Sequence, residues 1–325
     1  MQTLRPQKEK DPTMPRAEGN DFCELFGFAP DDLSETARKQ WKSQQCPFVG
    51  GVCVKHSHPQ RNGQTVVYGS CSVRNQTRER SEEVIVCPQR LYAGSYEALR
   101  RCVRDAIDFS EPIYLAGEYS ALKREGKLPR EYAVCLGHKS GREISLSNPG
   151  VIELSIDWAV AVVLREQLNS IIPCEVQSID TTGNYHDTWE AYSRELPDIP
   201  NSRHGMNWAN VWKRLIPQLI LKGCVASTST LCKRGLYFIV PDRVYVQFEK
   251  LVGEVAACSK PGPGVLTVMT YGLGPAVPPG QVRELAHLRT MRMSLANFAV
   301  AFSSGRQLPL GTQLDAKVAA ILAAL

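Results

Sequence analysis

The stretch VIELSIDWAVAVVLREQLNSIIPCEVQSID, residues Val151–Asp180, decides the fold that we expect for this chain. Apolar and polar residues alternate in its first part, so Asp157 and Glu153 share one face of a strand predicted over residues 151–163. In its second part, Glu175 and Gln177 share a face of another predicted strand in the same way. The stretch therefore predicts two strands that carry acidic side chains among apolar ones.

The segment before this stretch, REISLS at residues 142–147, repeats the alternation and places Glu143 on a polar face. If the three strands pair as neighbours in matching register, Glu143, Asp157 and Glu175 converge. Acidic side chains among apolar residues are costly unless a positive group lies among them. A bound divalent cation would resolve that conflict, and so would a solvated sheet face. Both alternatives stay open at this point.

The rest of the chain predicts a mixed α/β (α+β) fold in which helices flank a mixed sheet, preceded by a small cysteine-rich module. Residues 1–20 read as a disordered leader, residues 21–94 as the module and residues 95–325 as the main domain. We expect further strands at residues 65–68, 84–87, 132–137, 235–240 and 264–269. We expect helices at 34–42, 95–109 (capped by Ser95), 187–195, 206–222 (kinked at Pro217 and ended by Gly223) and 314–325.

Composition excludes few classes of protein. The 325 residues are 43% hydrophobic and 22% charged, as in ordinary globular proteins. No run reaches the ~18 apolar residues of a membrane span, and the first residues lack the apolar core of a secretory signal. We therefore expect a cytoplasmic protein without a membrane partner. The net charge of +5 is compatible with a polyanionic partner but does not establish one.

Four of the eleven cysteines lie in the predicted module, and they are Cys46, Cys53, Cys71 and Cys87. Four thiolates can hold one tetrahedral metal ion, and a small module rich in turns would gain much of its stability from one. However, the module contains no CxxC pair, so scattered free thiols are the alternative. His56 or His58 could replace one cysteine as a ligand.

Asp157 followed by Glu175-x-Gln177 has the form of the nuclease motif D…(D/E)xK, with Gln in the place of Lys. Two carboxylates and the carbonyl of Val176 suit magnesium, which activates water and neutralises charge on a phosphodiester. Gln177 would orient the attacking water by hydrogen bonds. The motif alone is weakly specific.

Together with the cysteines, the motif resembles that of the NotI-type restriction endonucleases, which have a PD-(D/E)xK core. The resemblance extends from Glu24 to Pro241, and its matches are CPF (from Cys46), CVK (from Cys53), VCPxR (ending at Arg90), GREISLS, LSIDW, EVQS and NVWKR (residues 210–214). It implies that the four module cysteines bind one structural iron; four thiolates would suit zinc as well. It further implies that Asp157, Glu175 and Gln177 are the nuclease signature and that Glu143 is an additional acid beside the metals.

The function implied by the resemblance is that of a type II restriction endonuclease. Such an enzyme would make magnesium-dependent double-strand cuts in duplex DNA at a GC-rich palindrome, as a homodimer in the bacterial cytoplasm, beside a companion DNA methyltransferase. Its DNA contacts would come from the basic residues after the motif, which are Arg194, Arg203, His204, Lys213, Arg214, Lys233 and Arg234. The alternatives are a non-catalytic, metal-stabilised DNA-binding regulator and a glycosidase that uses Asp157 and Glu175 as paired carboxylates.

Overall fold

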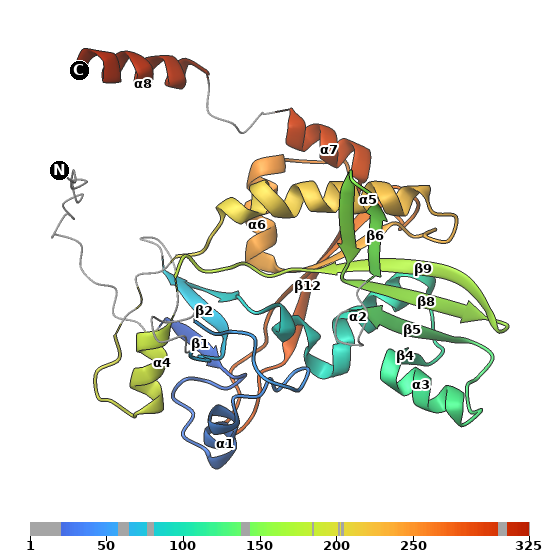
Figure 1. The fold of residues 1–325 in the computed structure, drawn as a ribbon, viewed down its shortest axis with the longest axis horizontal. Helices are drawn as coiled ribbons and strands as arrows, with labels where there is room; N and C mark the ends of the chain where they lie inside the picture. The colour runs from blue at the N-terminus through green and yellow to red at the C-terminus, as the bar shows by residue number, and fades with distance from the viewer. Residues whose placement is uncertain are drawn as a thin grey trace.

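A seven-stranded mixed sheet with helices on both faces forms the body of this α/β protein (Figure 1). The computed structural model describes residues 21–57, 65–76, 81–137, 144–183, 185–200, 202, 205–304 and 311–324. The leader predicted for residues 1–20 lies outside these residues. None of the helices in the described parts of the chain is long and apolar enough to cross a membrane.

The order of the large sheet is β12-β11-β10-β9-β8-β5-β4. Strands β9, β10 and β11 run parallel to one another, whereas β8 is antiparallel to both of its neighbours and β12 is antiparallel to β11. Strands β4 and β5 are parallel. The mixed sheet that the sequence predicted is thus confirmed. The strands are β4 (Ile113–Leu115), β5 (Tyr132–Gly137), β8 (Trp158–Leu164), β9 (Gln167–Val176), β10 (Leu236–Pro241), β11 (Val265–Leu273) and β12 (Leu285–Ser294).

The central strand β10 shows why helices cover both faces of the sheet. All of its side chains are apolar and buried, and successive ones point to opposite faces. Tyr237 and Ile239 pack with helix α2 (Ala93–Ile107). Phe238 and Val240 pack on the other face, where the helices are α5 (Ile216–Thr228), α6 (Asp242–Val252) and α7 (Leu295–Ser303). The result is a three-layer arrangement (Figure 1).

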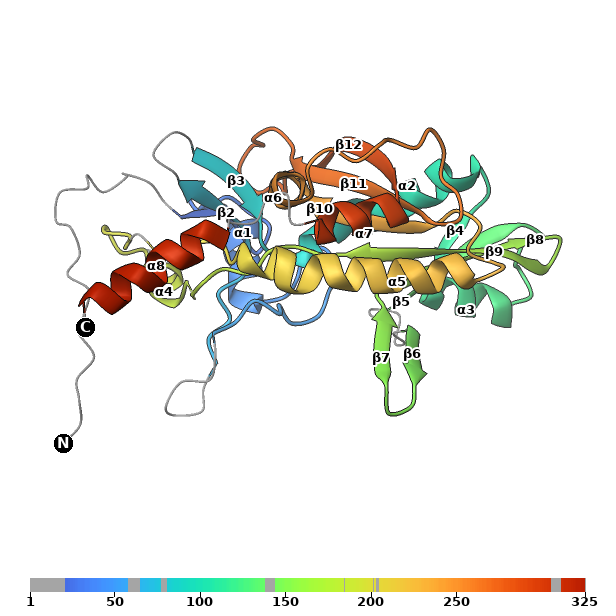
Figure 2. The ribbon, with the colours of Figure 1, turned by 90° about the horizontal axis from the view of Figure 1, so that it is seen from above.

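The chain leaves the large sheet in a two-stranded ribbon, β6 (Ile144–Asn148) and β7 (Ile152–Ile156), which projects from the body beside α5 (Figure 2). The expected single strand over residues 151–163 is therefore wrong, because β7 and β8 separate at Asp157. The polar alternation of β7 suits an exposed ribbon, and the uniformly apolar sequence of β8 suits a buried strand. The expected pairing of all three segments as neighbours is wrong as well, since β6 pairs with β7 alone.

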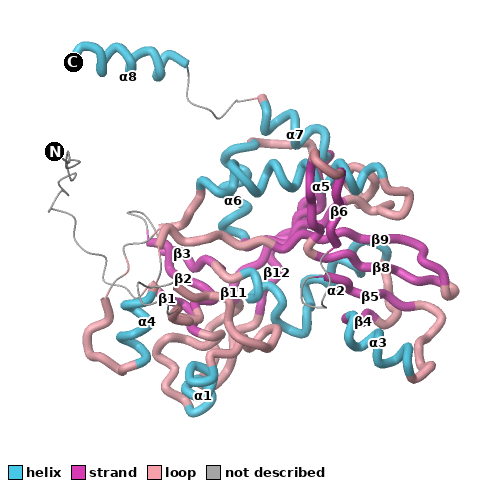
Figure 3. Tube along the Cα trace, in the orientation of Figure 1, coloured by secondary structure: helices cyan, strands magenta, loops and turns pink. Residues whose placement is uncertain are grey.

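The N-terminal module is built on a second antiparallel sheet. It contains β1 (Phe22–Leu25), β2 (Ser70–Gln76) and β3 (Ser81–Ile85), together with helix α1 (Glu35–Ser43), and loops make up much of the rest (Figure 3). Ser34 caps α1 by accepting a hydrogen bond from the N–H of Ala37. The sequence predicted α1 correctly but did not predict β1 or β2. The strand predicted at residues 65–68 contributes only an isolated bridge between Val67 and His56.

The module shares its hydrophobic core with the rest of the protein. Trp189 of helix α4 (His186–Ser193) lies against the module, with its ring centroid 5.3 Å from that of Phe26 and 6.2 Å from that of Trp41. One continuous cluster of buried residues joins these side chains to Phe238 in the large sheet. Hydrophobic packing is thus continuous across the domain boundary that we predicted at residue 94.

The start of α2 differs from the prediction. Ser95 is not the N-cap of the helix, because Gly94, Ser95 and Tyr96 all adopt left-handed conformations with φ of 68°, 57° and 64°. The aromatic ring of Tyr96 lies 5.6 Å from that of Trp158, and this packing accompanies the unusual backbone. A 3₁₀ turn, η1 (Pro88–Tyr92), precedes the helix.

The long helix predicted at residues 206–222 also differs. A π-helical turn, η3 (Val211–Leu215), precedes α5 in place of a kink, and the N–H of Ile216 bonds to the carbonyl of Val211. Gly223 does not end α5; it lies where the helix contacts α7, and a Cβ there would be 2.6 Å from Cδ2 of Leu295. The remaining helices are α3 (Ala116–Arg124) and α8 (Gly311–Ala324), which stands apart from the body in Figure 1.

A fully buried ion pair connects the module to its surroundings. Glu24 of β1 and Arg90 of η1 have no exposed side-chain surface, and two of their nitrogen–oxygen distances are 3.0 Å. Ser72 donates a further hydrogen bond of 2.9 Å to Glu24, and Arg90 donates one of 2.7 Å to the carbonyl of Arg283. Four distant segments of the chain therefore meet at this pair.

Replacing Arg90 by Met is expected to lower the free energy of unfolding by about 3–5 kcal/mol, because Glu24 would remain buried without its partner. Urea denaturation followed by circular dichroism measures this loss. Arg104→Met is the matched control, because its pair with Glu97 is half-exposed and such pairs contribute about 0–1 kcal/mol. Equal losses in the two variants would contradict the structural role of Arg90.

Candidate functional site

The side chain of Glu175 is held by the backbone of Asp157, and the side chain of Asp157 by the backbone of Val176, the residue after Glu175. Trp158 of β8 pairs with Cys174 of β9, so the residues on either side of this pair are neighbours as well. The N–H of Asp157 donates to Oε1 of Glu175 over 3.3 Å, and the N–H of Val176 donates to Oδ2 of Asp157 over 3.0 Å. The two carboxylates that the sequence singled out are thus brought together.

Both carboxylates lie on the α5 side of the sheet. Trp158 and Cys174 are buried with α2, and in a strand the adjacent side chains point to the opposite face. Gly137 of β5 allows the close approach on which this arrangement depends, because a Cβ there would lie only 2.4 Å from the carbonyl oxygen of Asp157. Strand register and one glycine therefore position the acids.

Lys222 of α5 completes the site, and sequence reasoning missed it. Its ammonium group forms an ion pair with Oε2 of Glu175, and 7% of Lys222 and 6% of Glu175 are exposed. A signal was present in the sequence. Lys222 follows Leu215 and Leu219 at helical spacing, on the stripe that the helix buries. A lysine at such a position needs a partner, since lysines are almost never fully buried without one.

The surroundings of Glu175 act on its proton affinity in opposite directions. Burial, followed by the charge of Asp157, raises the pKa of Glu175 to about 8, while the ammonium of Lys222 acts to lower it. Two acids and one base share this space, so negative charge is in excess whenever both carboxylates are ionised. Such an excess attracts cations.

The donors present fit magnesium. Magnesium is bound in proteins through one or two carboxylates and completes its shell with water and substrate phosphate oxygens. Asp157 and Glu175 supply the carboxylates. The carbonyl of Val176 lies on the same strand edge as its N–H, which faces Asp157. Among the described residues, no group of three or more His, Cys, Asp or Glu side chains is arranged to hold a metal ion. A magnesium ion bound by this pair would therefore rely on water and substrate for its other ligands.

Gln177, the third residue of the motif, lies just beyond the end of β9. Its backbone N–H donates to the carbonyl of Ile239 over 3.0 Å, and its side chain is exposed. Together with Asp180, it lines a small cavity of about 190 Å³ between the strand exit and the helix. Arg214 and Gln218 line the same cavity from η3 and α5. This cavity, called the groove below, is lined by neither Asp157 nor Glu175, and Gln177 lies two residues along the chain from Glu175.

The other predicted site residues are distributed unevenly. Lys213 and Arg214 are exposed on η3. Lys233 and Arg234 are exposed near the opposite end of β9, where Lys233 donates to the carbonyl of Asn169. Six residues of strand separate Asn169 from Glu175, which corresponds to about 20 Å. Four further predicted residues lie outside the described residues, and these are His58, Glu143, Arg203 and His204.

All four module cysteines are buried. Burial raises the pKa of Cys53 to about 12, and the charges of Cys87 and Cys46 act in the same direction. Burial likewise raises the pKa of Cys71, with contributions from Cys87 and Cys53. The module thus gathers the four thiols in one region, although their side chains do not form one of the metal-holding groups sought among the described residues.

Two contacts connect this cysteine region to the end of β9. The hydroxyl of Ser178 donates to the carbonyl of Val86 over 3.0 Å, one residue before Cys87. Nζ of Lys55, two residues after Cys53, lies 3.7 Å from Oδ1 of Asp180. The segment that carries Gln177 is therefore attached to the module on one side and to β10 on the other.

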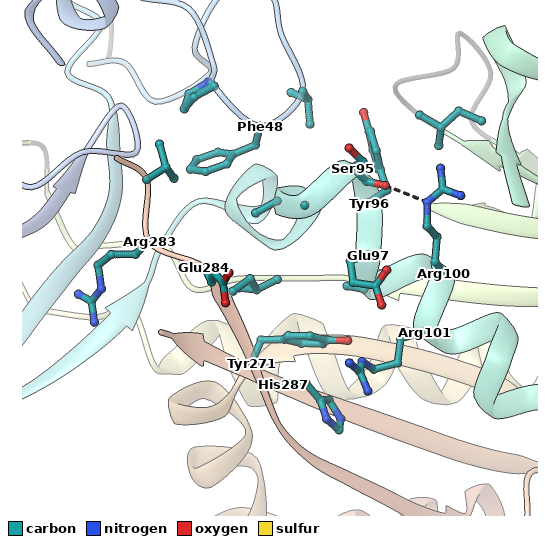
Figure 4. A pocket seen from close by; sticks show the side chains of 18 of the residues that line it. Phe48, Ser95, Tyr96, Glu97, Arg100, Arg101, Tyr271, Arg283, Glu284 and His287 are labelled. Carbon is teal, nitrogen blue, oxygen red and sulfur yellow. Dashed lines mark hydrogen bonds between the residues drawn. The ribbon is translucent and has the colours of Figure 1, made fainter. Parts of the chain in front are cut away.

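A larger cavity, of about 840 Å³, lies between the module, α2 and β12 (Figure 4). Most of its charged groups already have partners. Arg283 binds Glu83, Arg100 donates to the carbonyl of Ser95, and Glu97 binds Arg104. Because none of the predicted site residues lines it, whereas Gln177 and Arg214 line the smaller cavity, we do not assign the candidate site to this cavity.

Replacing Ser178 by Ala is expected to lower stability by about 1 kcal/mol and to speed amide hydrogen exchange over residues 177–180. The reason is that the strand exit loses its bond to Val86. Hydrogen-exchange mass spectrometry measures the effect. Ser193→Ala is the control, because the exposed Ser193 hydroxyl bonds only within α4. Unchanged exchange at residues 177–180 in Ser178→Ala would contradict the attachment.

A scan against protein-family models found no match to this chain, and a search of curated proteins found none either. A functional conclusion therefore depends on the residues and on their geometry.

Proposed function

We propose that this protein is a metal-dependent nuclease with a PD-(D/E)xK-type core, and specifically a type II restriction endonuclease that cuts both strands of duplex DNA. The observation that carries the proposal is the close placement of Asp157 and Glu175 next to the ammonium of Lys222, with the N–H of Asp157 donating to Glu175 and the N–H of Val176 donating to Asp157. A structural ion pair would need one acid and one base. Here a second acid, Asp157, is held beside the pair, which suits a cation, and the groove begins at Gln177, two residues after Glu175.

The roles of the residues follow from their positions. Asp157, Glu175 and the carbonyl of Val176 would hold magnesium, which when bound supplies an activated water and neutralises phosphate charge. Gln177 would orient that water from the strand exit. The water oxygen forms a bond to phosphorus, the bond to one deoxyribose oxygen breaks, and the leaving oxygen gains a proton while the water loses one.

The substrate and the assembly state are part of the same proposal. Arg214 and Lys213 lie on η3 beside the groove, where they can contact backbone phosphates. The resemblance adds a GC-rich palindromic target, which a homodimer would read through two-fold symmetry. It also adds a bacterial cytoplasmic setting and a companion methyltransferase in a restriction–modification pair.

The cysteine module would contribute a structural iron. Support comes from the gathering of four buried thiols beside the strand exit, since four thiolates suit iron and zinc alike. An iron bound there would brace the segment attached through Val86 and Lys55.

The rival function is that of a DNA-binding regulator without catalytic activity. A regulator of this kind would also use the cysteine module and the basic residues beside the groove. It would have no use for Asp157, the second carboxylate. Incubating purified protein with plasmid and magnesium separates the two, because discrete fragments arise only from a nuclease.

Asp157→Ala and Glu175→Gln are each expected to lower magnesium-dependent cleavage of plasmid DNA by about 100-fold or more, because each removes a carboxylate from the metal-binding pair. DNA binding in EDTA should persist in both variants. Asp157→Asn is the matched control for structure, since its side-chain oxygen can still accept from Val176. Full cleavage by a well-purified Asp157→Ala protein would overturn the assignment.

Metal analysis of the purified protein is expected to find one iron per chain, with visible thiolate-to-iron absorption. Replacing Cys71 by Ser should abolish the colour, because Cys71 is one of the four proposed ligands. Cys224→Ser is the control, because this cysteine is exposed on α5. If the protein is colourless and contains one zinc ion, the metal of the module is zinc and not iron. If the protein is folded and free of metal, the proposed role of the module is contradicted.

A further inference from the structure

Resting on the proposed nuclease function, we propose that Lys222 contacts the DNA phosphodiester at the catalytic site and serves as the counter-ion of Glu175 when neither DNA nor metal is bound. The sequence motif has Gln177 at the position where related motifs carry a lysine. Gln177 cannot supply a positive charge. The structure brings a lysine to the same acid from another element, α5.

The position of Lys222 supports a contact with substrate. Arg214, Gln218 and Lys222 follow one another at intervals of four residues, so they share one side of the helical segment. Successive members are about 6 Å apart along the axis. Arg214 and Gln218 line the groove together with Gln177. Lys222 does not line it, but lies one turn of α5 beyond Gln218, where it pairs with Glu175. Helix α5 thus carries one hydrogen-bond donor at the groove and the next one beside the acid pair.

Charge balance supports the same role. With both acids ionised, Asp157, Glu175 and Lys222 sum to one net negative charge. A divalent cation makes the sum one positive, and a phosphodiester then brings it to zero. Without Lys222 the complete site would hold one uncompensated negative charge, which is unfavourable where Glu175 and its surroundings are buried. Lys222 therefore matches the site to a phosphodiester as substrate.

The first test is DNA binding in EDTA, where cleavage is absent. Wild-type protein and Lys222→Met are titrated with a fluorescent GC-rich duplex over a range of salt concentrations. Loss of one phosphate contact is expected to reduce the slope of log K against log salt by about 0.9. Lys250→Met is the control, because it removes one exposed lysine from α6, outside the site, and should leave the slope unchanged.

The second test is manganese binding in the absence of DNA, measured by calorimetry. Lys222→Met is expected to bind manganese at least roughly tenfold more tightly than wild type, because the competing ammonium is gone. A purely structural lysine would not produce weaker DNA binding together with tighter metal binding. Weaker manganese binding by a folded Lys222→Met protein would contradict the counter-ion role.

Lys222→Met leaves Glu175 buried without its cation and can fail to fold. In that case Glu175→Gln/Lys222→Met is compared with Glu175→Gln, since both lack the buried charge on residue 175. The slope of log K against log salt is again expected to differ by about 0.9 between these two variants. An unchanged slope in this comparison, or in the single variant where it folds, overturns the phosphate contact. If the wild-type protein does not cut DNA, the proposed nuclease function is overturned. If the wild type cuts DNA but the variants show unchanged salt slopes, only the inference about Lys222 is overturned.

Discussion

The register between β8 and β9 is the constraint on which the candidate site depends. Pairing of Trp158 with Cys174 makes Asp157 and Glu175 neighbours, and each acid then bonds to the other's strand. A slip of one residue would turn Glu175 from the α5 face to the α2 face, because side chains alternate along a strand. The close approach of Gly137 to the carbonyl of Asp157 places β5, the third strand, against β8. Sheet geometry, and not a flexible loop, therefore positions the carboxylates, which suits a site that must hold its ligands in fixed positions.

Two buried ion pairs in the same protein show how structural and functional charges differ. Glu24 and Arg90 are matched one to one, and the oxygens of Glu24 receive bonds from Arg90 and Ser72 within a closed environment. Glu175 is paired with Lys222 and also lies beside a second acid, Asp157. The charges of the first pair balance without any ligand. The second holds an excess of negative charge whenever both of its carboxylates are ionised, and that makes it the better candidate for binding a cation.

The sequence predicted those parts of the fold that local pattern determines. The apolar run of β5 and the capped helix α1 are examples, and the acid pair was found from its motif. It did not reveal that β7 and β8 separate at Asp157, because the alternation of apolar and polar residues continues through the break as far as Trp158. Lys222 was missed for a different reason. Its role depends on α5 crossing β9, a contact between segments 47 residues apart. Only its place on a buried stripe of the helix distinguished it from other lysines.

The attachment of the strand exit to the cysteine module explains why a nuclease core would carry such a module. Gln177 follows the last residue of β9 and has an exposed side chain, so β9 alone does not fix its direction. The bond from Ser178 to Val86 and the ion pair of Asp180 with Lys55 hold the next residues against the segments that carry Cys87 and Cys53. A metal ion that holds the four thiols in place would therefore also hold the segment that follows β9. A module that lies far from Asp157 along the chain can in this way control the placement of the residue that faces the groove, without contributing a ligand to the site itself.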